Sequence, residues 1–326
     1  MNKVEQITVD ADEADQRLDR WFKRRFPALG HGRLEKLLRT GQVRVDGARA
    51  KANQHLSAGQ VIRVPPLPIA AKGDERKPSS KAKISERDAA FMRDLVLYKD
   101  DDLIALNKPS GLAVQGGSKT TRHVDGMLDA LQFDAKERPR LVHRLDRDTS
   151  GVLIVARTAR AAARLARQFQ SGEIKKTYWA LVHGKPQYAR GTIDAALIKA
   201  GAPGREKMKW DDKEGRDAVT DYITVDHAAD RVSWLALMPR TGRTHQLRAH
   251  CALMDTPIVG DAKYGGAKRE ESGELAGSGD RLCLHARRIE IPQPGKKPLV
   301  IEAPPASHIK ALFATLGFNE RDAINL

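Results

Sequence analysis

A continuous apolar run, Val-Leu-Ile-Val-Ala at residues 152–156, is the strongest hydrophobic feature of the chain. A run of this length indicates a strand that is buried on both faces. Residues 143–148, immediately before it, instead carry a histidine and four charged side chains. Ser150 and Gly151 predict a turn at the start of the strand. The pattern therefore predicts charged side chains at the rim of a buried sheet.

Further elements are predicted on both sides of this run. The alanine- and arginine-rich residues 158–170 predict an amphipathic helix. Residues 174–182 alternate as a strand in which Tyr178, Ala180 and Val182 share one face. The remaining pattern predicts strands at residues 95–98, 103–107, 219–225 and 232–237, a loop or irregular hairpin at 199–218, and helices at 244–254 and 306–316.

The first 65 residues have a different pattern, with apolar side chains at helical spacing in two successive segments. Arg33, Lys36 and Arg39 recur at the same spacing, so they share one face of the second predicted helix. Gly41 is well placed to end this helix. After it, the sequence predicts a strand that contains Arg44, a tight turn at residues 46–47 and a closing strand at 61–64.

Residues 66–87 predict a flexible basic linker. The segment begins with prolines, which favour an extended chain, and continues with lysine, serine, glycine and proline, which have little to bury. The expected organisation is therefore a small unit of residues 1–65, the linker at 66–87 and a larger domain of residues 88–326.

Charge and composition narrow the class of protein. Among the 326 residues, 57 Lys and Arg exceed 42 Asp and Glu, a net charge of +15. This balance favours a polyanionic partner such as nucleic acid, although an indifferent basic surface would give the same count. The two cysteines, Cys251 and Cys283, imply no disulfide framework. With no apolar leader and no membrane-length run, we expect a cytoplasmic protein without a membrane partner.

Asp146 is the first candidate for chemistry. It lies between Arg144 and Arg147, whose positive charges favour its ionised form. An ionised carboxylate at the rim of a sheet is either a nucleophile or the centre of structural ion pairs. From these residues alone the structural interpretation is favoured, because structural ion pairs also cluster charges.

The sequence His-Arg-Leu-Asp-Arg-Asp-Thr-Ser-Gly at residues 143–151 resembles the signature of the pseudouridine synthases of the RluA superfamily. Within it, the chain is most similar to the RluC class, which modifies large-subunit ribosomal RNA. Three more segments match in the family's order: Asn-Lys-Pro-Ser-Gly at 107–111, Lys-Lys-Thr-Tyr-Trp-Ala at 175–180 and Thr-Gly-Arg-Thr-His-Gln-Leu-Arg at 241–248. The first 65 residues resemble the S4 RNA-binding module, with Asp46 where asparagine is common.

The resemblance implies an α+β fold, in which helices flank a mixed, largely antiparallel sheet, with a small α/β module before it. It implies that Asp146 is the nucleophile, that Arg248 is its ion-pair partner, and that Tyr178 stacks on the target base. Tyr178 is also a candidate for the base that later removes a proton from carbon. Arg144 is implied to fill the gap left by the extruded base. Contacts to RNA are expected from Lys108, Arg243, His245, Arg33, Lys36, Arg39 and Arg44.

Uridine isomerisation neither gains nor loses electrons, so no redox cofactor is expected. A metal site at His245 and His250 is disfavoured, because residues five apart lie on different faces of a helix. The expected partner is RNA, most simply 23S ribosomal RNA or a large-subunit precursor, and we expect a monomer. The alternatives are a non-catalytic RNA-binding or ribosome-assembly factor, a pseudouridine synthase acting on tRNA, and an N-glycoside hydrolase with Asp148 as second carboxylate.

Overall fold

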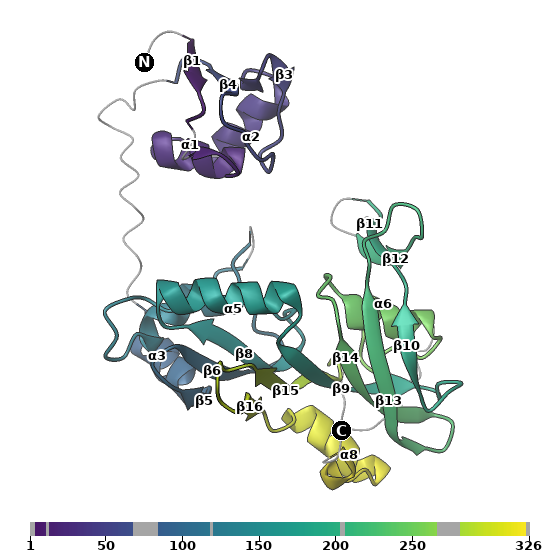
Figure 1. Ribbon diagram of the computed structural model, residues 1–326. Coiled ribbons are helices and arrows are strands. Elements are labelled where there is room, and N and C mark those ends of the chain that lie inside the picture. The colour runs from purple at the N-terminus through teal and green to yellow at the C-terminus, as the bar shows by residue number, and fades with distance from the viewer. Residues whose placement is uncertain are drawn as a thin grey trace. The chain divides into compact units, whose positions relative to one another are not determined.

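The computed structural model describes residues 4–10, 13–67, 84–117, 120–202, 206–265 and 281–323. The chain divides into two compact units, residues 1–83 and 84–326 (Figure 1). Most of the expected linker, residues 68–83, lies outside the described residues. Its last residues do not belong to a linker, because helix α3 (Glu86–Asp94) begins there and the Ser85 hydroxyl caps it by accepting from the Asp88 amide.

The first unit packs two helices, α1 (Leu18–Arg25) and α2 (His31–Arg39), with a four-stranded antiparallel sheet. The strand order is β1-β4-β2-β3, with bounds Glu5–Thr8, Val61–Val64, Arg44–Val45 and Ala48–Arg49. The pattern of residues 1–65 did not predict β1, because its half-polar sequence is short and its partner β4 lies more than fifty residues away. Leu18, Trp21 and Phe22 are buried in the core, as their spacing predicted.

A buried carboxylate fastens α1 to the chain before it. The Glu13 side chain is 2% exposed. It accepts hydrogen bonds from the Trp21 indole at 2.9 Å and from Arg25 Nε and Nη2, each at 3.0 Å. The hydrogen bond from Arg25 is the main influence that lowers the pKa of Glu13 below its ordinary value of 4.5. This carboxylate is therefore part of the structural core of the first unit.

The second unit is organised on one large sheet with the strand order β10-β13-β14-β9-β15-β8-β6-β5, to which β16 and β7 add at β15 and β8. Its pairs are antiparallel except for β15 with β8. The bounds are β5 (Val96–Lys99), β6 (Leu103–Lys108), β7 (Arg140–Leu141), β8 (Ser150–Ala156), β9 (Lys175–His183), β10 (Arg190–Asp194), β13 (Val219–Ala228), β14 (Val232–Pro239), β15 (Leu284–Ile291) and β16 (Leu299–Glu302).

Helices cover this sheet, and a hairpin of β11 (Leu197–Ala200) and β12 (Lys207–Trp210) stands apart from it. Helix α5 (Ala159–Ser171) lies along β8, as Figure 1 shows, and the Thr158 hydroxyl caps it by accepting from the Ala161 amide. The other helices are α4 (Val124–Met127), η2 (Leu128–Leu131), α6 (Gln246–Leu253), α8 (Ser307–Leu316) and η4 (Glu320–Ala323). Within the described ranges, every helix is too short or too polar to cross a bilayer.

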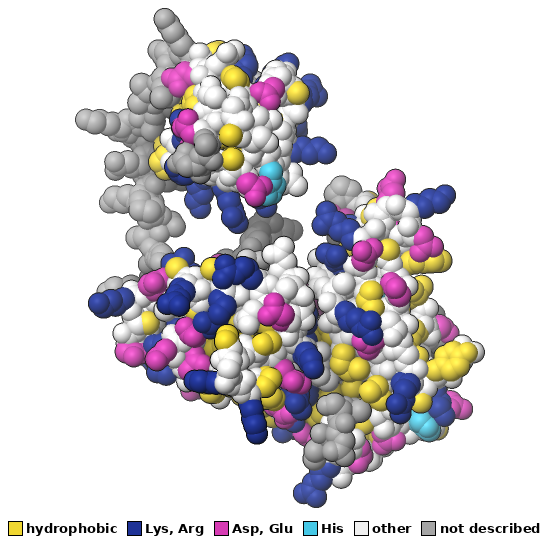
Figure 2. Space-filling model, viewed as in Figure 1, with side chains coloured by type: hydrophobic (Ala, Val, Ile, Leu, Met, Phe, Trp, Pro, Cys, Tyr) yellow, Lys and Arg dark blue, Asp and Glu magenta, His cyan; other side chains and the backbone are white. Residues whose placement is uncertain are grey.

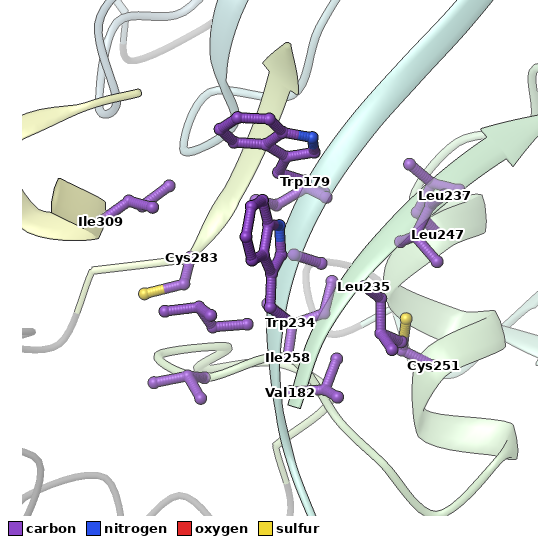
Figure 3. Close-up of a cluster of buried hydrophobic side chains, with 14 of the residues drawn as sticks. Trp179, Val182, Trp234, Leu235, Leu237, Leu247, Cys251, Ile258, Cys283 and Ile309 are labelled. Atoms are coloured by element: carbon purple, nitrogen blue, oxygen red, sulfur yellow. The ribbon is translucent and has the colours of Figure 1, made fainter. Parts of the chain in front are cut away.

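Helix α6 is held by its apolar face. Leu247 and Cys251 point into a buried cluster around Trp234, to which Leu235 and Leu237 of β14 also contribute (Figure 3). The β14 side chains fix the position of the helix, because a packed core tolerates little displacement. The polar residues at the start of α6 are therefore held against the end of the sheet.

Ser150 and Gly151 lie inside strand β8, so the predicted turn at this point is wrong. They pair in parallel with His285 and Ala286 of β15. Gly151 has φ +105°, and a Cβ there would lie 2.2 Å from the Ala286 carbonyl oxygen. The glycine is needed because β15 passes too close for any side chain. That contact joins segments more than 130 residues apart and could not be read locally.

Candidate active site

A cavity of about 530 Å³ opens in the second unit, where β9, α5, the segment before β8 and the start of α6 meet. It brings together six of the residues singled out from the sequence, which come from three separate segments. They are Arg144, Asp146, Tyr178, Arg243, His245 and Arg248. Lys108 does not line it, and Arg33, Lys36, Arg39 and Arg44 belong to the other unit.

Asp146 lies on the segment that joins β7 to β8, and a second loop braces this segment. The Gly111 amide donates to the Arg147 carbonyl at 2.9 Å, and Arg147 Nε donates back to the Gly111 carbonyl at 3.0 Å. The Ser110 hydroxyl donates to the Asp148 carbonyl at 2.8 Å. These bonds hold the backbone on the carboxyl side of Asp146, so the carboxylate is carried by a rigid support.

The expectation that Lys108 contacts RNA is wrong. Its side chain is 0% exposed, and its ammonium donates to the carbonyls of Pro109, Leu112 and Arg147, each at 2.9 Å. All three of its protons are used. Burial lowers the pKa of Lys108 to about 7, although the charges of Asp148 and Asp146 oppose this shift. Lys108 is therefore a brace for the Asp146 segment rather than an RNA ligand.

Arg248 lies on α6 beside two carboxylates, and it forms hydrogen bonds to only one of them. Its Nε and Nη2 donate to the two oxygens of Asp261, both at 2.7 Å, and both side chains are almost fully buried. Its Nη1 lies 3.9 Å from Asp146 Oδ2. The bidentate pair with Asp261 sets the plane and the direction of the guanidinium. The ion-pair partner predicted for Asp146 is therefore present, but it is oriented by Asp261.

Asp146 remains open to the cavity. Its side chain is 21% exposed, and its nearest basic atoms are Arg248 Nη1 at 3.9 Å and His245 Nε2 at 3.8 Å. Among the described residues, none donates a hydrogen bond to its carboxylate. Positive charge at this distance attracts the carboxylate without occupying the oxygen lone pairs. The carboxylate oxygens are thus available to a bound molecule.

Tyr178 forms part of the cavity wall on β9 and packs between two hydrophobic clusters of the unit. Burial, followed by the charge of Asp146, raises the pKa of its phenol above the usual 10.0. The side chain is therefore a neutral phenol at physiological pH. A neutral phenol suits a ring that contacts a nucleobase. It disfavours a role for Tyr178 as the general base that takes up a proton.

Arg243 and His245 lie on the loop between β14 and α6. Gln246 secures this loop, because its side-chain Oε1 accepts from the Thr241 hydroxyl at 2.7 Å and from the Arg243 amide at 3.0 Å. Arg243 Nε donates to the Asp217 carbonyl at 2.9 Å. Burial, opposed by the charge of Asp146, lowers the pKa of His245. These residues both support the loop and line the cavity mouth.

Comparison with known proteins identifies the family of the chain. The profile of the family described as RNA pseudouridylate synthase matches residues 102–253. Ribosomal large subunit pseudouridine synthase C of Salmonella typhimurium is 35% identical over 96% of this chain and 97% of its own length. The chain belongs to the RNA pseudouridylate synthase family. Ribosomal large subunit pseudouridine synthase C of Escherichia coli K12 is 36% identical over 92% of this chain and 93% of its own length.

Solved structures give the same family. Human RNA pseudouridylate synthase domain containing 4 has a TM-score of 0.60 at 25% identity, covering 71% of this chain and 97% of its own. Human RNA pseudouridylate synthase domain containing 1 has a TM-score of 0.55 at 30% identity, covering 67% and 86%. The resemblance to the RluA superfamily and the α+β fold predicted from it are confirmed. The chain is a pseudouridine synthase, and its substrate is RNA.

Two residues of the site were not singled out from the sequence, Asp261 and Tyr264. Tyr264 lies under the guanidinium of Arg248 at 5.2 Å, and its hydroxyl is 3.1 Å from His245 Nδ1. A signal for Asp261 was present, since a buried apolar pair and Gly260 precede it. Gly260 has φ +75°, and a Cβ there would lie 1.9 Å from the Arg281 carbonyl oxygen. The partner of Asp261, however, lies on another element and was visible only in the fold.

Proposed function

We propose that this enzyme isomerises uridines of large-subunit ribosomal RNA. The observation that carries the proposal is the similarity, over nearly the whole chain, to proteins named ribosomal large subunit pseudouridine synthase C. Similarity of this extent includes the first unit, and not only the catalytic unit that the family profile matches. A tRNA substrate is the alternative.

We propose that Asp146 carries out the first chemical step. Pseudouridine formation breaks the bond between uracil N1 and the sugar carbon C1′, turns the base and joins C5 to C1′; C5 then loses its proton, and N1 gains one. A carboxylate can attack C1′ or remove the proton on the neighbouring carbon, and both roles need an ionised group with a free lone pair. The exposed oxygens of Asp146 and the adjacent charge of Arg248 support either role.

The remaining cavity residues are assigned to holding the extruded nucleotide. A target base must leave its stack before reaction, at a cost of a few kcal/mol. Arg144 is exposed at the cavity, where its side chain can fill the gap that the base leaves. Tyr178 provides a ring surface against the uracil, and Arg243 and His245 contact the backbone near the mouth.

We propose that the first unit is an S4-like RNA anchor. Arg33, Lys36 and Arg39 are exposed on α2 and share one of its faces. Arg44 donates to the carbonyls of Gly41 and Gly47, so it also braces the hairpin that follows α2. Figure 2 shows Lys and Arg side chains exposed on both units, interspersed with acidic ones. Exposed basic side chains on one helix face fit phosphate contacts.

We further propose a monomeric enzyme that works in the cytoplasm.

The test uses two RNA pools and one matched variant. Full-length enzyme is incubated with transcribed 23S ribosomal RNA or with unmodified tRNA, and pseudouridines are mapped at nucleotide resolution. We expect site-specific conversion in the 23S RNA and none with Asp146→Asn. Conversion confined to the tRNA pool would overturn the proposed substrate. Conversion by the Asp146→Asn protein would overturn the assignment of the nucleophile.

A further inference from the structure

One wall of the cavity carries a positive charge for which the described residues provide no carboxylate. Lys176 lies on β9, on the same face as Tyr178, and lines the cavity. Burial lowers the pKa of its ammonium. In the described part of the chain no carboxylate pairs with it. A half-buried ammonium without a partner is costly, which points to a ligand that supplies the missing negative charge.

The bases that line the cavity from the end of β14 and the start of α6 differ in this respect. Arg240 is held by both oxygens of Asp221, at 2.6 and 2.8 Å, and Arg248 is held by both oxygens of Asp261. Arg243 Nε already donates to a backbone carbonyl. Arg240 and Arg248 are thus engaged in supporting the site, and Arg243 is engaged in part. Lys176, on β9, has no carboxylate partner among the described residues and is available to a ligand.

His143 adds a hydrogen-bond donor beside Lys176. Its Nε2 accepts the Ile154 amide proton at 2.8 Å, and its ring stacks on Phe169 at 4.3 Å. Because Nε2 is the acceptor, the neutral ring must carry its proton on Nδ1. Burial, followed by the charge of Lys176, lowers the pKa of His143 to about 3, so the ring stays neutral. The structure therefore holds a fixed N–H donor near an ammonium that has no carboxylate partner in the described part of the chain.

We propose that Lys176 and the Nδ1–H of His143 form a seat for one phosphodiester group of the RNA, next to the extruded uridine. A phosphate accepts both a charged and a neutral donor, and RNA is the polyanion that this cavity must admit. The seat fixes the backbone on the β9 side while the base enters toward Asp146. This inference rests on the proposed function and assigns two residues that the proposed mechanism leaves without a role.

The first test compares neighbouring lysines on the two faces of β9. Lys176→Met and Lys175→Met are each made in the Asp146→Asn protein, which leaves the bound substrate unconverted. Their affinity is measured for an RNA fragment that the wild-type enzyme isomerises. We expect Lys176→Met to weaken binding about 10-fold, the loss typical of one charged hydrogen bond. The salt dependence should fall by about 0.7 in slope, the value for one phosphate on a single strand. Lys175→Met, on the exposed side, should change neither quantity.

The second test removes the charge from the RNA instead. A neutral methylphosphonate, placed after a 2′-O-methyl nucleotide for chemical stability, replaces the phosphate on the 5′ or the 3′ side of the target uridine in turn. At one of the two positions, the substitution should weaken binding about 10-fold when the protein keeps Lys176. At that same position it should not weaken binding further when the protein carries Lys176→Met, because the contact is already lost. Additive losses at both positions would overturn the proposed seat.

The third test separates the two nitrogens of His143. Asparagine places an amide N–H near the Nδ1 position, whereas glutamine places an oxygen near Nε2, where it can still accept from Ile154. We expect His143→Asn to keep RNA affinity but lose stability, and His143→Gln to keep stability but weaken binding. If His143→Gln kept the RNA affinity and His143→Asn lost it, the histidine would be purely structural, and its part of the seat would be overturned.

These outcomes are separate from the test of the proposed function. If the wild-type enzyme isomerises only tRNA, the same variants are measured on that RNA. A Lys176→Met protein with unchanged affinity and salt slope but a reduced kcat would overturn the phosphate seat, because it would place Lys176 in the chemical step.

Discussion

Asp146 and Asp261 flank the same guanidinium, yet their surroundings are opposite. Asp261 is fully buried and accepts two bonds from Arg248 and one each from the amides of Lys263 and Tyr264. Burial raises its pKa, but these bonds outweigh burial and leave the pKa lowered. Asp146 is partly exposed, and both basic neighbours lie beyond hydrogen-bond distance. The saturated carboxylate positions Arg248, and the open one is left for the substrate.

The same contrast extends to the rest of the chain. Glu13 in the first unit is saturated by Trp21 and Arg25, as Asp261 is by Arg248. Lys108 is saturated by three carbonyls, whereas Lys176 faces the cavity without a carboxylate partner among the described residues. Burial alone therefore does not separate structural from functional charges. The number of unsatisfied donors or acceptors separates them, because a group whose hydrogen bonds are all made within the protein cannot bond to a ligand.

The largest effect is expected at the open carboxylate. Asp146→Asn should lower turnover about 10⁴-fold or more, since a neutral amide is a poor nucleophile and base. Its free energy of unfolding should stay within about 0.5 kcal/mol, because no hydrogen bond is lost. Single-turnover isomerisation and denaturant unfolding measure the two quantities. Asp148→Asn is the control and should retain turnover, whereas a comparable loss there would support a two-carboxylate hydrolase site.

At the saturated carboxylate, the loss should be divided between stability and rate. Asp261→Asn leaves the buried guanidinium of Arg248 without a bidentate partner, which should cost about 3–5 kcal/mol of unfolding free energy. Turnover should also fall, because Arg248 is no longer oriented. Asp221→Asn breaks the more exposed pair with Arg240 and should cost about 1 kcal/mol or less. Equal losses in both variants would contradict the distinction.

Glu13 predicts a pH dependence of the first unit. Its pKa is lower in the folded state than the ordinary 4.5, so the folded chain binds fewer protons there than the unfolded chain. Its contribution to stability is therefore complete above about pH 4.5 and is lost as the pH falls through the folded pKa. Glu13→Gln should cost about 2 kcal/mol at neutral pH by leaving Arg25 poorly paired. Hydrogen exchange of α1 and α2 in the full chain measures both effects.

The smallest effect concerns exposed bases that no fold contact requires. Replacing Arg33, Lys36 and Arg39 together by glutamine should leave stability unchanged and reduce the salt slope of RNA binding by about 2–3, for three phosphate contacts. The control replaces Arg20 and Lys23, which are exposed on α1, by glutamine. An unchanged slope in the triple variant, or an equal change in the control, would contradict an RNA-binding face on α2.

Local sequence pattern predicted the elements well where periodicity carries the information. The apolar run became β8, the alternating segment became β9, and the alanine-rich segment became α5. Helix α6 followed from the same kind of pattern. These elements depend on which faces are apolar, and the order of side chains along the chain states this directly. Strand β1 was missed because its partner, rather than its own composition, makes it a strand.

The sequence by itself determined the family, the order of the elements and the residue types that meet at the cavity, because motifs and periodicity are local. Only the tertiary structure decided which charges are saturated. Lys108 and Lys176 are alike as residues, and so are Asp146 and Asp261, which follow Leu145 and Gly260 in segments outside the strands. Their roles differ because partners on other elements, from 13 to about a hundred residues away, fill or leave empty their hydrogen-bonding capacity.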